Sequence, residues 1–134
     1  MDIVYRTDLA AVDWTEMKAA VAADDFDNGR TPEQLRRSFE ASYVCCVAYA
    51  DGAMVGTARA LSDGVCNAYV VDVWTRNDLR RRGIARTMLT MLEQRLEGQH
   101  VYLFSDDNAE FYLACGYRGR PVGLEKVIGT WLQS

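Results

Sequence analysis

The segment that most limits what this chain can fold into is residues 67–74, NAYVVDVW, which is rich in β-branched and aromatic residues. Its apolar character is nearly continuous, as expected for a strand that is covered on both faces. An arginine-rich turn follows it, and apolar residues then recur at helical spacing from Ile84 to Leu96. A buried central strand that leads into an amphipathic helix indicates a layered α/β domain.

The remaining segments alternate between strand-like and helix-like patterns. Asp51-Gly52 separates two strand-like runs and is a strong hairpin signal, because both residues tolerate a positive φ. Helices begin at the capping signals Asp13 and Thr31. The predicted order is β-α-α-β-β-β-α-β-α-β, with further strands at 2–7, 43–50, 53–61, 100–104 and 123–129 and further helices at 13–26, 31–42 and 109–116.

The size and charge of the chain limit its function classes. Its 134 residues, 49% hydrophobic, predict a single domain over residues 1–134. A net charge of -4 argues against general binding to nucleic acid or to an anionic membrane, since both depend on Lys and Arg. No apolar stretch approaches the roughly 20 residues of a membrane span, and the first residues lack a signal-peptide pattern, so we expect a cytoplasmic protein.

Cysteine and histidine give no sign of a metal site. The four cysteines form no C-x-x-C pair and His100 is the only imidazole, so we expect no bound metal. Cys45 and Cys46 are adjacent in a predicted strand, where their side chains point to opposite faces. We interpret both as small buried hydrophobic residues rather than as parts of a disulfide framework.

Residues 80–86, RRRGIAR, lie where the central strand leads into a helix. The first turn of a helix presents unpaired N–H groups and a positive dipole end, which favour phosphate binding. Gly83 would let an anion approach the backbone closely. The P-loop and dinucleotide-binding signatures are both absent, and a solvated loop before a helix is an equally good reading of the spacing alone.

The pattern Arg80-x-x-Gly83-x-Ala85 resembles the [Q/R]-x-x-G-x-[G/A] signature of the Gcn5-related N-acetyltransferase (GNAT) superfamily. The later segment AEFYLACGY, residues 109–117, resembles a second motif of that family, and the predicted element order is also the family's order. The resemblance implies a GNAT-like fold, with a mixed, mainly antiparallel sheet and helices on both faces. It also implies acetyl-CoA as co-substrate.

A closer resemblance concerns the central strand. The segments SDGVCNAYVVDV, YLF and CGYRGRPVG are similar to the branch with plant chloroplast serotonin N-acetyltransferases and bacterial relatives. This likeness runs from about Ser62 to Gly123 and suggests an amine acceptor, without implying serotonin itself.

The family's cofactor contacts map onto two stretches of this sequence. The end of the central strand would bind the pantetheine arm through its main chain and polarise the thioester carbonyl. The arginine turn would hold the pyrophosphate. The expected cofactor-binding residues are Val73, Trp74, Thr75, Arg81, Arg82, Gly83, Ile84, Ala85 and Arg86.

Two residues are candidates for proton transfer. Tyr112 matches the family tyrosine that protonates the departing CoA thiolate; a core aromatic is the alternative. Asp72 is a carboxylate in an apolar strand, where burial would raise its pKa toward that of a general base. A structural pair with a nearby Arg or Tyr is an equally good reading, and a base acting through a water chain is also compatible.

The acceptor side is the least determined part. Asp24, Asp25 and Asp27 lie near Phe26, and an acidic, aromatic rim would suit a cationic amine, although a solvated loop is the simpler reading. We expect an N-acetyltransferase of a small primary amine that acts by direct attack without an acyl-enzyme. The alternatives are a protein-lysine or N-terminal acetyltransferase and a non-catalytic acyl-CoA-binding module. The resemblance, with an apolar Trp131 near the C-terminal end, also allows a homodimer.

Overall fold

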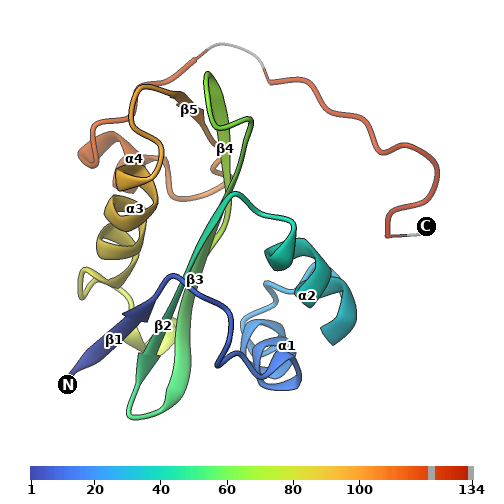
Figure 1. The fold of residues 1–134 in the computed structure, drawn as a ribbon, viewed down its shortest axis with the longest axis vertical. Coiled ribbons are helices and arrows are strands. Elements are labelled where there is room, and N and C mark those ends of the chain that lie inside the picture. The colour runs from blue at the N-terminus through green and yellow to red at the C-terminus, as the bar shows by residue number, and fades with distance from the viewer. Residues whose placement is uncertain (121–122, 133–134) are drawn as a thin grey trace. The chain divides into compact units, whose positions relative to one another are not determined.

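The structure is a computed structural model that describes residues 1–120 and 123–132. These residues form two compact units, Met1–Leu103 and the chain from Phe104 onward. The elements of the first unit, in chain order, are β1 (Ile3–Arg6), α1 (Trp14–Ala23), α2 (Pro32–Glu40), β2 (Val44–Ala50), β3 (Ala53–Ser62), β4 (Asn67–Thr75), the 3-10 helix η1 (Asn77–Leu79), α3 (Ile84–Gln94) and β5 (His100–Tyr102) (Figure 1).

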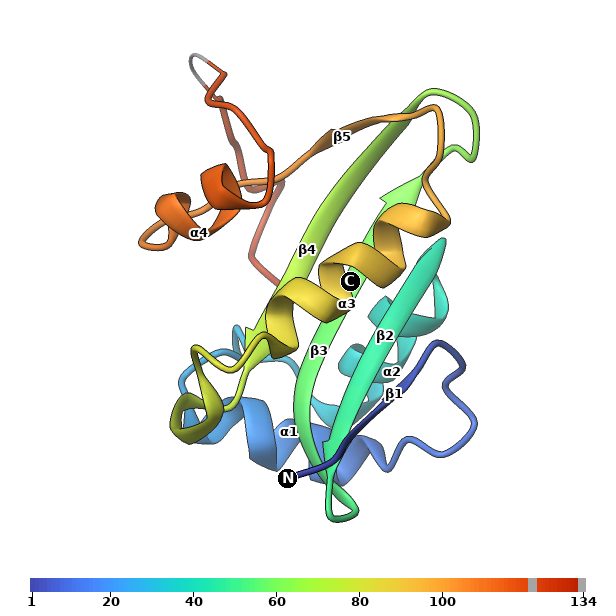
Figure 2. The ribbon, with the colours of Figure 1, turned by 90° about the vertical axis from the view of Figure 1, so that its left-hand side faces the viewer.

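The five strands form one mixed sheet in the order β1-β2-β3-β4-β5. All neighbours are antiparallel except β4 and β5, which are parallel. Helix α3 lies on one face of the sheet, and α1 and α2 lie on the other (Figure 2). The structure therefore confirms the mainly antiparallel sheet with helices on both faces.

Local sequence signals explain where the elements begin and turn. Asp51 and Gly52 have φ values of 51° and 81° and join β2 to β3, as the hairpin signal predicts. Asp13 caps α1 by accepting hydrogen bonds from the amides of Thr15 and Glu16. Thr31 caps α2 through a capping box with Gln34, and a proline occupies the first turn.

The core of the first unit lies on both sides of the sheet. On one side, side chains of α1 and α2 pack with those of β2, β3 and β4 in a cluster that includes Met17, Phe39 and Trp74. On the other side, α3 buries its apolar face, and Met88 and Leu92 are fully covered. Burial of one such side chain contributes about 1.5–3 kcal/mol, so both helical layers hold β4 in place.

The second unit contains one helix, α4 (Ala109–Ala114), within the residues that the structure describes. The prediction of a strand over residues 123–129 is wrong, because this segment has no regular structure. Its apolar residues Leu124 and Ile128 are 88% and 81% exposed. A strand needs a neighbour to pair its backbone groups, and the described residues provide none for this segment.

Some sequence predictions lie outside the described residues or are not tested. The described residues leave out Pro121 and Val122, which belong to the CGYRGRPVG match. They also leave out residues 133–134, which follow shortly after Trp131. A single domain over residues 1–134 stays a prediction. No helix among the described residues is long and apolar enough to cross a membrane.

Candidate functional site

A bulge in β4 is the centre of the candidate site. Thr57 pairs with Trp74 and Arg59 pairs with Val71, so two residues of β4, Asp72 and Val73, lie opposite the single residue between Thr57 and Arg59. Asp72 adopts a left-handed backbone conformation, φ 56°, which aspartate tolerates better than most residues. The hydroxyl of Thr57 donates a 2.9 Å hydrogen bond to the carbonyl of Asp72. Bulges bend a strand and redirect its side chains, so this one fixes how the end of β4 is presented.

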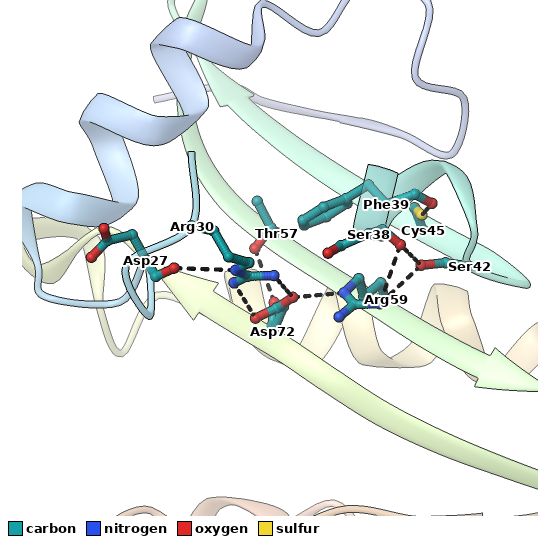
Figure 3. Close-up of polar contacts among 9 residues, drawn as sticks. All are labelled: Asp27, Arg30, Ser38, Phe39, Ser42, Cys45, Thr57, Arg59 and Asp72. Atoms are coloured by element: carbon teal, nitrogen blue, oxygen red, sulfur yellow. Dashed lines mark hydrogen bonds and ion pairs between the residues drawn. The ribbon is translucent and has the colours of Figure 1, made fainter. Parts of the chain in front are cut away.

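The Asp72 carboxylate is buried between two arginines (Figure 3). Arg30, in the α1–α2 loop, donates from Nη1 and Nη2 to the two carboxylate oxygens, each at 2.9 Å. Arg59, on β3, donates from Nε to Oδ2 at 2.6 Å. The guanidinium of Arg59 also lies over the ring of Phe39, 5.6 Å from its centroid. The three charged side chains form one network that ties the loop, β3 and β4 together.

These contacts correct the expected ionisation of Asp72. Burial by itself raises the pKa of this carboxyl. The hydrogen bonds and positive charge of Arg30, followed by those of Arg59, outweigh burial and hold the pKa below its usual value. The prediction of a raised pKa is therefore wrong, and the geometry matches the alternative of a structural pair with arginine.

One edge of β4 is only partly paired. β5 pairs with β4 over Asn67–Tyr69 alone, while β4 continues to Thr75. Beyond Tyr69 that edge of β4 faces no other strand of the described sheet. Backbone N–H and C=O groups on such an edge are available to an extended ligand.

The three residues expected to contact the pantetheine arm end this open stretch. Trp74 is buried in the core cluster, so its side chain cannot reach a ligand. Val73 and Thr75 are partly exposed. The hydroxyl Oγ1 of Thr75 is buried and has no hydrogen-bond partner among the described residues. An unsatisfied buried hydroxyl is costly, and a polar ligand atom would relieve that cost.

The N-terminus of α3 lies at the arginine turn. Gly83 is its N-cap in a left-handed conformation, φ 81°, and no side chain caps the helix. Arg81 also has a positive φ, 65°. No helix cap or ion pair among the described residues accounts for this backbone conformation. A Cβ added at Gly83 would meet no atom within 4 Å, so only a ligand would be obstructed by a side chain there. Arg81, Arg82 and Gly83 are exposed, Ile84 is buried, and Ala85 and Arg86 lie on the first turn.

Tyr112 lies on α4 in the second unit. Its ring packs edge-on against Phe111 and Tyr117, with centroids 4.9 Å and 6.0 Å away. Burial, followed by the nearby Cys115, raises the pKa of the Tyr112 phenol above its usual value. Tyr112 therefore retains its proton at neutral pH.

Internal contacts of the α1–α2 loop account for most of the predicted acidic rim. Asp24 accepts hydrogen bonds from Trp74 Nε1 at 2.9 Å and from the Asn77 amide at 3.1 Å. Asp27 forms an ion pair with Lys18. Phe26 packs against the core cluster, and Asp25 is exposed. The loop is thus attached to β4 at the bulge, by Arg30, and just beyond it, by Asp24.

The cysteines have the structural role that the sequence indicates. Cys45 and Cys46 are buried, and all four cysteines, each within the described residues, are free thiols. Burial raises the pKa of the Cys46 thiol to about 11 and also raises that of Cys45. The described residues include no cluster of three or more His, Cys, Asp or Glu side chains that could hold a metal ion.

Arg30 and Arg59 are site residues that sequence reasoning missed. Arg59 is a lone charge in the apolar run TARAL, the same signal that marks Asp72, and could have been recognised as its partner. Arg30 lies in a polar loop and gives no such signal, because its contact with Asp72 joins residues 42 positions apart.

Solved structures share this fold. A GNAT-family protein from Xanthomonas campestris is 21% identical, with a TM-score of 0.81 over 99% of both chains. A putative acetyltransferase from Deinococcus radiodurans is 25% identical, with a TM-score of 0.81 over 93% of this chain and 88% of that one. Glucosamine-6-phosphate N-acetyltransferase from Arabidopsis thaliana is 15% identical, with a TM-score of 0.73 over 96% of this chain and all of that one.

The chain thus has the fold of these acetyltransferases. The chain belongs to the Acetyltransferase (GNAT) family, whose family model matches residues 8–117. No curated protein matches the chain. The narrower resemblance to the plant serotonin branch therefore gains no support, whereas the resemblance to the superfamily is confirmed.

Proposed function

We propose that this chain transfers the acetyl group of acetyl-CoA to the primary amine of a small molecule, by direct attack and without an acyl-enzyme. The observation that carries the proposal is the open edge of β4, which leads through η1 to the uncapped N-terminus of α3. Acetyl-CoA combines an extended arm with two amides and a diphosphate. An unpaired strand edge followed by an anion-binding helix start suits both parts.

The residues present fit acetyl-CoA. Val73 and Thr75 offer backbone groups at the open end of β4, and the orphaned Thr75 hydroxyl offers one more hydrogen bond. Gly83 leaves open space at the helix start, and Arg81 and Arg82 add positive charge beside it. Trp74, Ile84, Ala85 and Arg86 complete the proposed set through their backbone positions.

Acetyl-CoA supplies an activated acetyl group as a thioester. The backbone amide at the bulge of β4 would donate a hydrogen bond to the thioester oxygen, where negative charge develops during attack. The chain would then mainly hold the amine and the thioester carbon in position, which lowers the barrier by proximity and orientation. Cys45 and Cys46 are buried with raised pKa values, so neither offers the thiolate that an acyl-enzyme route would need.

Two proton transfers accompany the reaction. Tyr112, whose pKa is raised, would donate its phenolic proton to the departing thiolate. The amine would lose its proton to solvent through water. Asp72 enters this proposal as a positioning residue that fixes the bulge through Arg30 and Arg59, and its action as the base stays the alternative to be tested.

A small acceptor is favoured by the attachment of the α1–α2 loop. Arg30 and Asp24 hold this loop against β4 at the bulge and just beyond it, which suits a compact amine better than an extended polypeptide. One structural neighbour bears the name of an enzyme that acetylates a small molecule, glucosamine-6-phosphate. Serotonin is not part of the proposal.

The first test is thermal unfolding with increasing acetyl-CoA. A ligand that binds only the folded state raises the melting temperature by an amount that grows with the ligand concentration, so the parent chain should show a dose-dependent increase. Gly83→Glu should lose that increase, because a carboxylate would then occupy the proposed diphosphate position.

Gly98→Glu is the matched control. Gly98 has φ 83°, and an added Cβ there also meets no atom within 4 Å, but it follows the other end of α3. Both variants therefore carry the same backbone strain and charge. Equal loss of stabilisation in both would refute the helix-start site, and no stabilisation of the folded parent would refute the proposed function.

A further inference from the structure

The network around Asp72 contains more positive than negative charge. One carboxylate faces two guanidiniums, and the three side chains are only 5%, 7% and 11% exposed for Asp72, Arg30 and Arg59. Asp27 contacts Arg30 only through its backbone carbonyl, and its carboxylate pairs with Lys18. No second carboxylate among residues 1–120 and 123–132 pairs with either arginine. The network thus has an uncompensated charge of one in a poorly hydrated place, where it attracts an anion strongly.

The two arginines differ in what they leave unpaired. Each guanidinium nitrogen of Arg30 already donates: Nε to the Asp27 carbonyl at 3.1 Å, and Nη1 and Nη2 to Asp72. Arg59 uses Nε for Asp72 and Nη1 for the Ser38 carbonyl and the Ser42 hydroxyl, both at 3.3 Å. Its Nη2 has no partner among the residues described. Figure 3 shows Arg59 beside Asp72, with Ser38, Ser42 and Phe39 on its other side.

Arg59 lies next to the place where the acceptor would react. Its Nε is 2.6 Å from the carboxylate of Asp72, and Val73 follows Asp72 in the bulge. The guanidinium of Arg59 would therefore lie within the length of a small molecule from an amine that attacks a thioester bound at this bulge.

From this geometry, and given the proposed function, we propose that the acceptor is a primary amine that also carries a carboxylate, and that Arg59 Nη2 binds this carboxylate. A monoanion balances the single excess charge, whereas a phosphate dianion would leave an excess of the opposite sign. Guanidinium–carboxylate hydrogen bonds are charge-assisted and stronger than neutral ones. The proposed site thus binds a negative group of the acceptor. An acidic rim would instead attract the positive charge of a cationic amine.

The test compares matched acceptors. A panel of amino acids that differ in chain length and side chain is assayed by CoA thiol release, each beside its carboxamide and its decarboxylated amine. For the best acceptor, kcat/KM should be roughly 10-fold to 100-fold higher for the acid than for either partner that lacks the carboxylate, the size expected for hydrogen bonds to a charged group. A parent enzyme that uses the partners without a carboxylate equally well or better overturns the inference.

Three variants assign the preference to Arg59. Arg59→Gln should remove the preference for the carboxylate, and Arg59→Lys should restore part of it by keeping the charge. Arg30→Gln removes an equal charge and an ion pair with the same aspartate but keeps Arg59 Nη2, so the preference should fall clearly less than in Arg59→Gln. An unchanged preference in a folded Arg59→Gln, with stabilisation by acetyl-CoA intact, also overturns the inference.

The outcomes separate this inference from the proposed function. Acetylation of amines that lack a carboxylate, without preference for the acids, refutes the carboxylate site alone. Absence of turnover on the whole panel, in a chain still stabilised by acetyl-CoA, refutes the small-amine acceptor and the carboxylate site together. If Arg59→Gln fails to fold, the comparison of each acid with its partners that lack the carboxylate, made on the parent enzyme, still decides whether the acceptor carries a carboxylate.

Discussion

Asp72 combines a left-handed backbone conformation with a buried charge, and its neighbours compensate for the charge in full. Removal of one partner from a buried ion pair is strongly destabilising, since the charge that remains is left without compensation. The network should therefore contribute to stability only while the carboxylate is ionised. Because the folded-state pKa is depressed, this contribution is present above the pKa of the unfolded chain and is lost as the pH falls through the folded-state value.

Asp72→Asn tests this dependence. At pH 7 the variant should lose about 3–5 kcal/mol of unfolding free energy, because Arg30 and Arg59 would be buried without a counter-charge. The difference from the parent should shrink as the pH falls below about 4, where the carboxyl of the unfolded parent becomes protonated, and should vanish only below the depressed folded-state pKa. Urea unfolding at several pH values measures both effects, and a difference that does not vary with pH contradicts the ion-pair assignment.

The same variant tests Asp72 as the base. If the carboxylate accepts the proton of the amine, Asp72→Asn removes a limb of the profile of kcat/KM against pH. If Asp72 only positions the bulge, the profile keeps its shape while its height falls.

Tyr112 gives a separate prediction. Tyr112→Phe should lower kcat by roughly 100-fold or more, the range of a lost general acid, and leave stabilisation by acetyl-CoA unchanged. In the parent, activity should fall at alkaline pH only above the usual tyrosine pKa of about 10, because burial raises the pKa of Tyr112. Tyr117→Phe, which removes the neighbouring hydroxyl, is the control and should retain kcat. Equal kcat in all three proteins would exclude Tyr112 as the acid.

Among the elements, the α1–α2 loop shows how a polar, turn-rich segment becomes part of a site. Asp24 accepts from Trp74 and from the backbone of Asn77, and Arg30 binds Asp72. The loop therefore depends on β4 for its position, and β4 depends on the loop for the charge balance of its bulge. Helix α3 shows the opposite behaviour, since its start is left without a cap where a ligand is proposed to bind.

Asp24→Ala and Asp24→Asn together test the attachment of the loop. Alanine removes the acceptor for two N–H groups and should cost about 1–3 kcal/mol of unfolding free energy. Asparagine keeps an oxygen that can accept both bonds and should cost clearly less. Chemical unfolding measures the stability. Unchanged stability with an increased KM for the amine in both variants would instead favour the acidic rim as the acceptor site.

On the scale of the whole molecule, the first unit contains every element of the proposed cofactor site, and Tyr112 lies in the second unit. The order of elements along the chain, the hairpin and the helix caps follow from local patterns and were predictable, because each involves residues close in sequence. The absence of a strand over residues 123–129 was not predictable. The sequence pattern shows only that this segment could pair as a strand, whereas the neighbouring strand that it needs depends on the tertiary fold.

The sequence by itself determined the family, the order of elements through α4 and the position of the arginine turn. These follow from the periodicity of apolar residues, from capping residues and from a short motif whose glycine needs a positive φ. Tertiary structure alone decided the charge of the site. Arg30 and Asp72 are far apart in sequence, and the pKa of a buried carboxyl depends on which charges the fold brings within hydrogen-bond distance. For that reason Asp72, which the sequence suggests as a base, is found in a buried ion pair with Arg30 and Arg59.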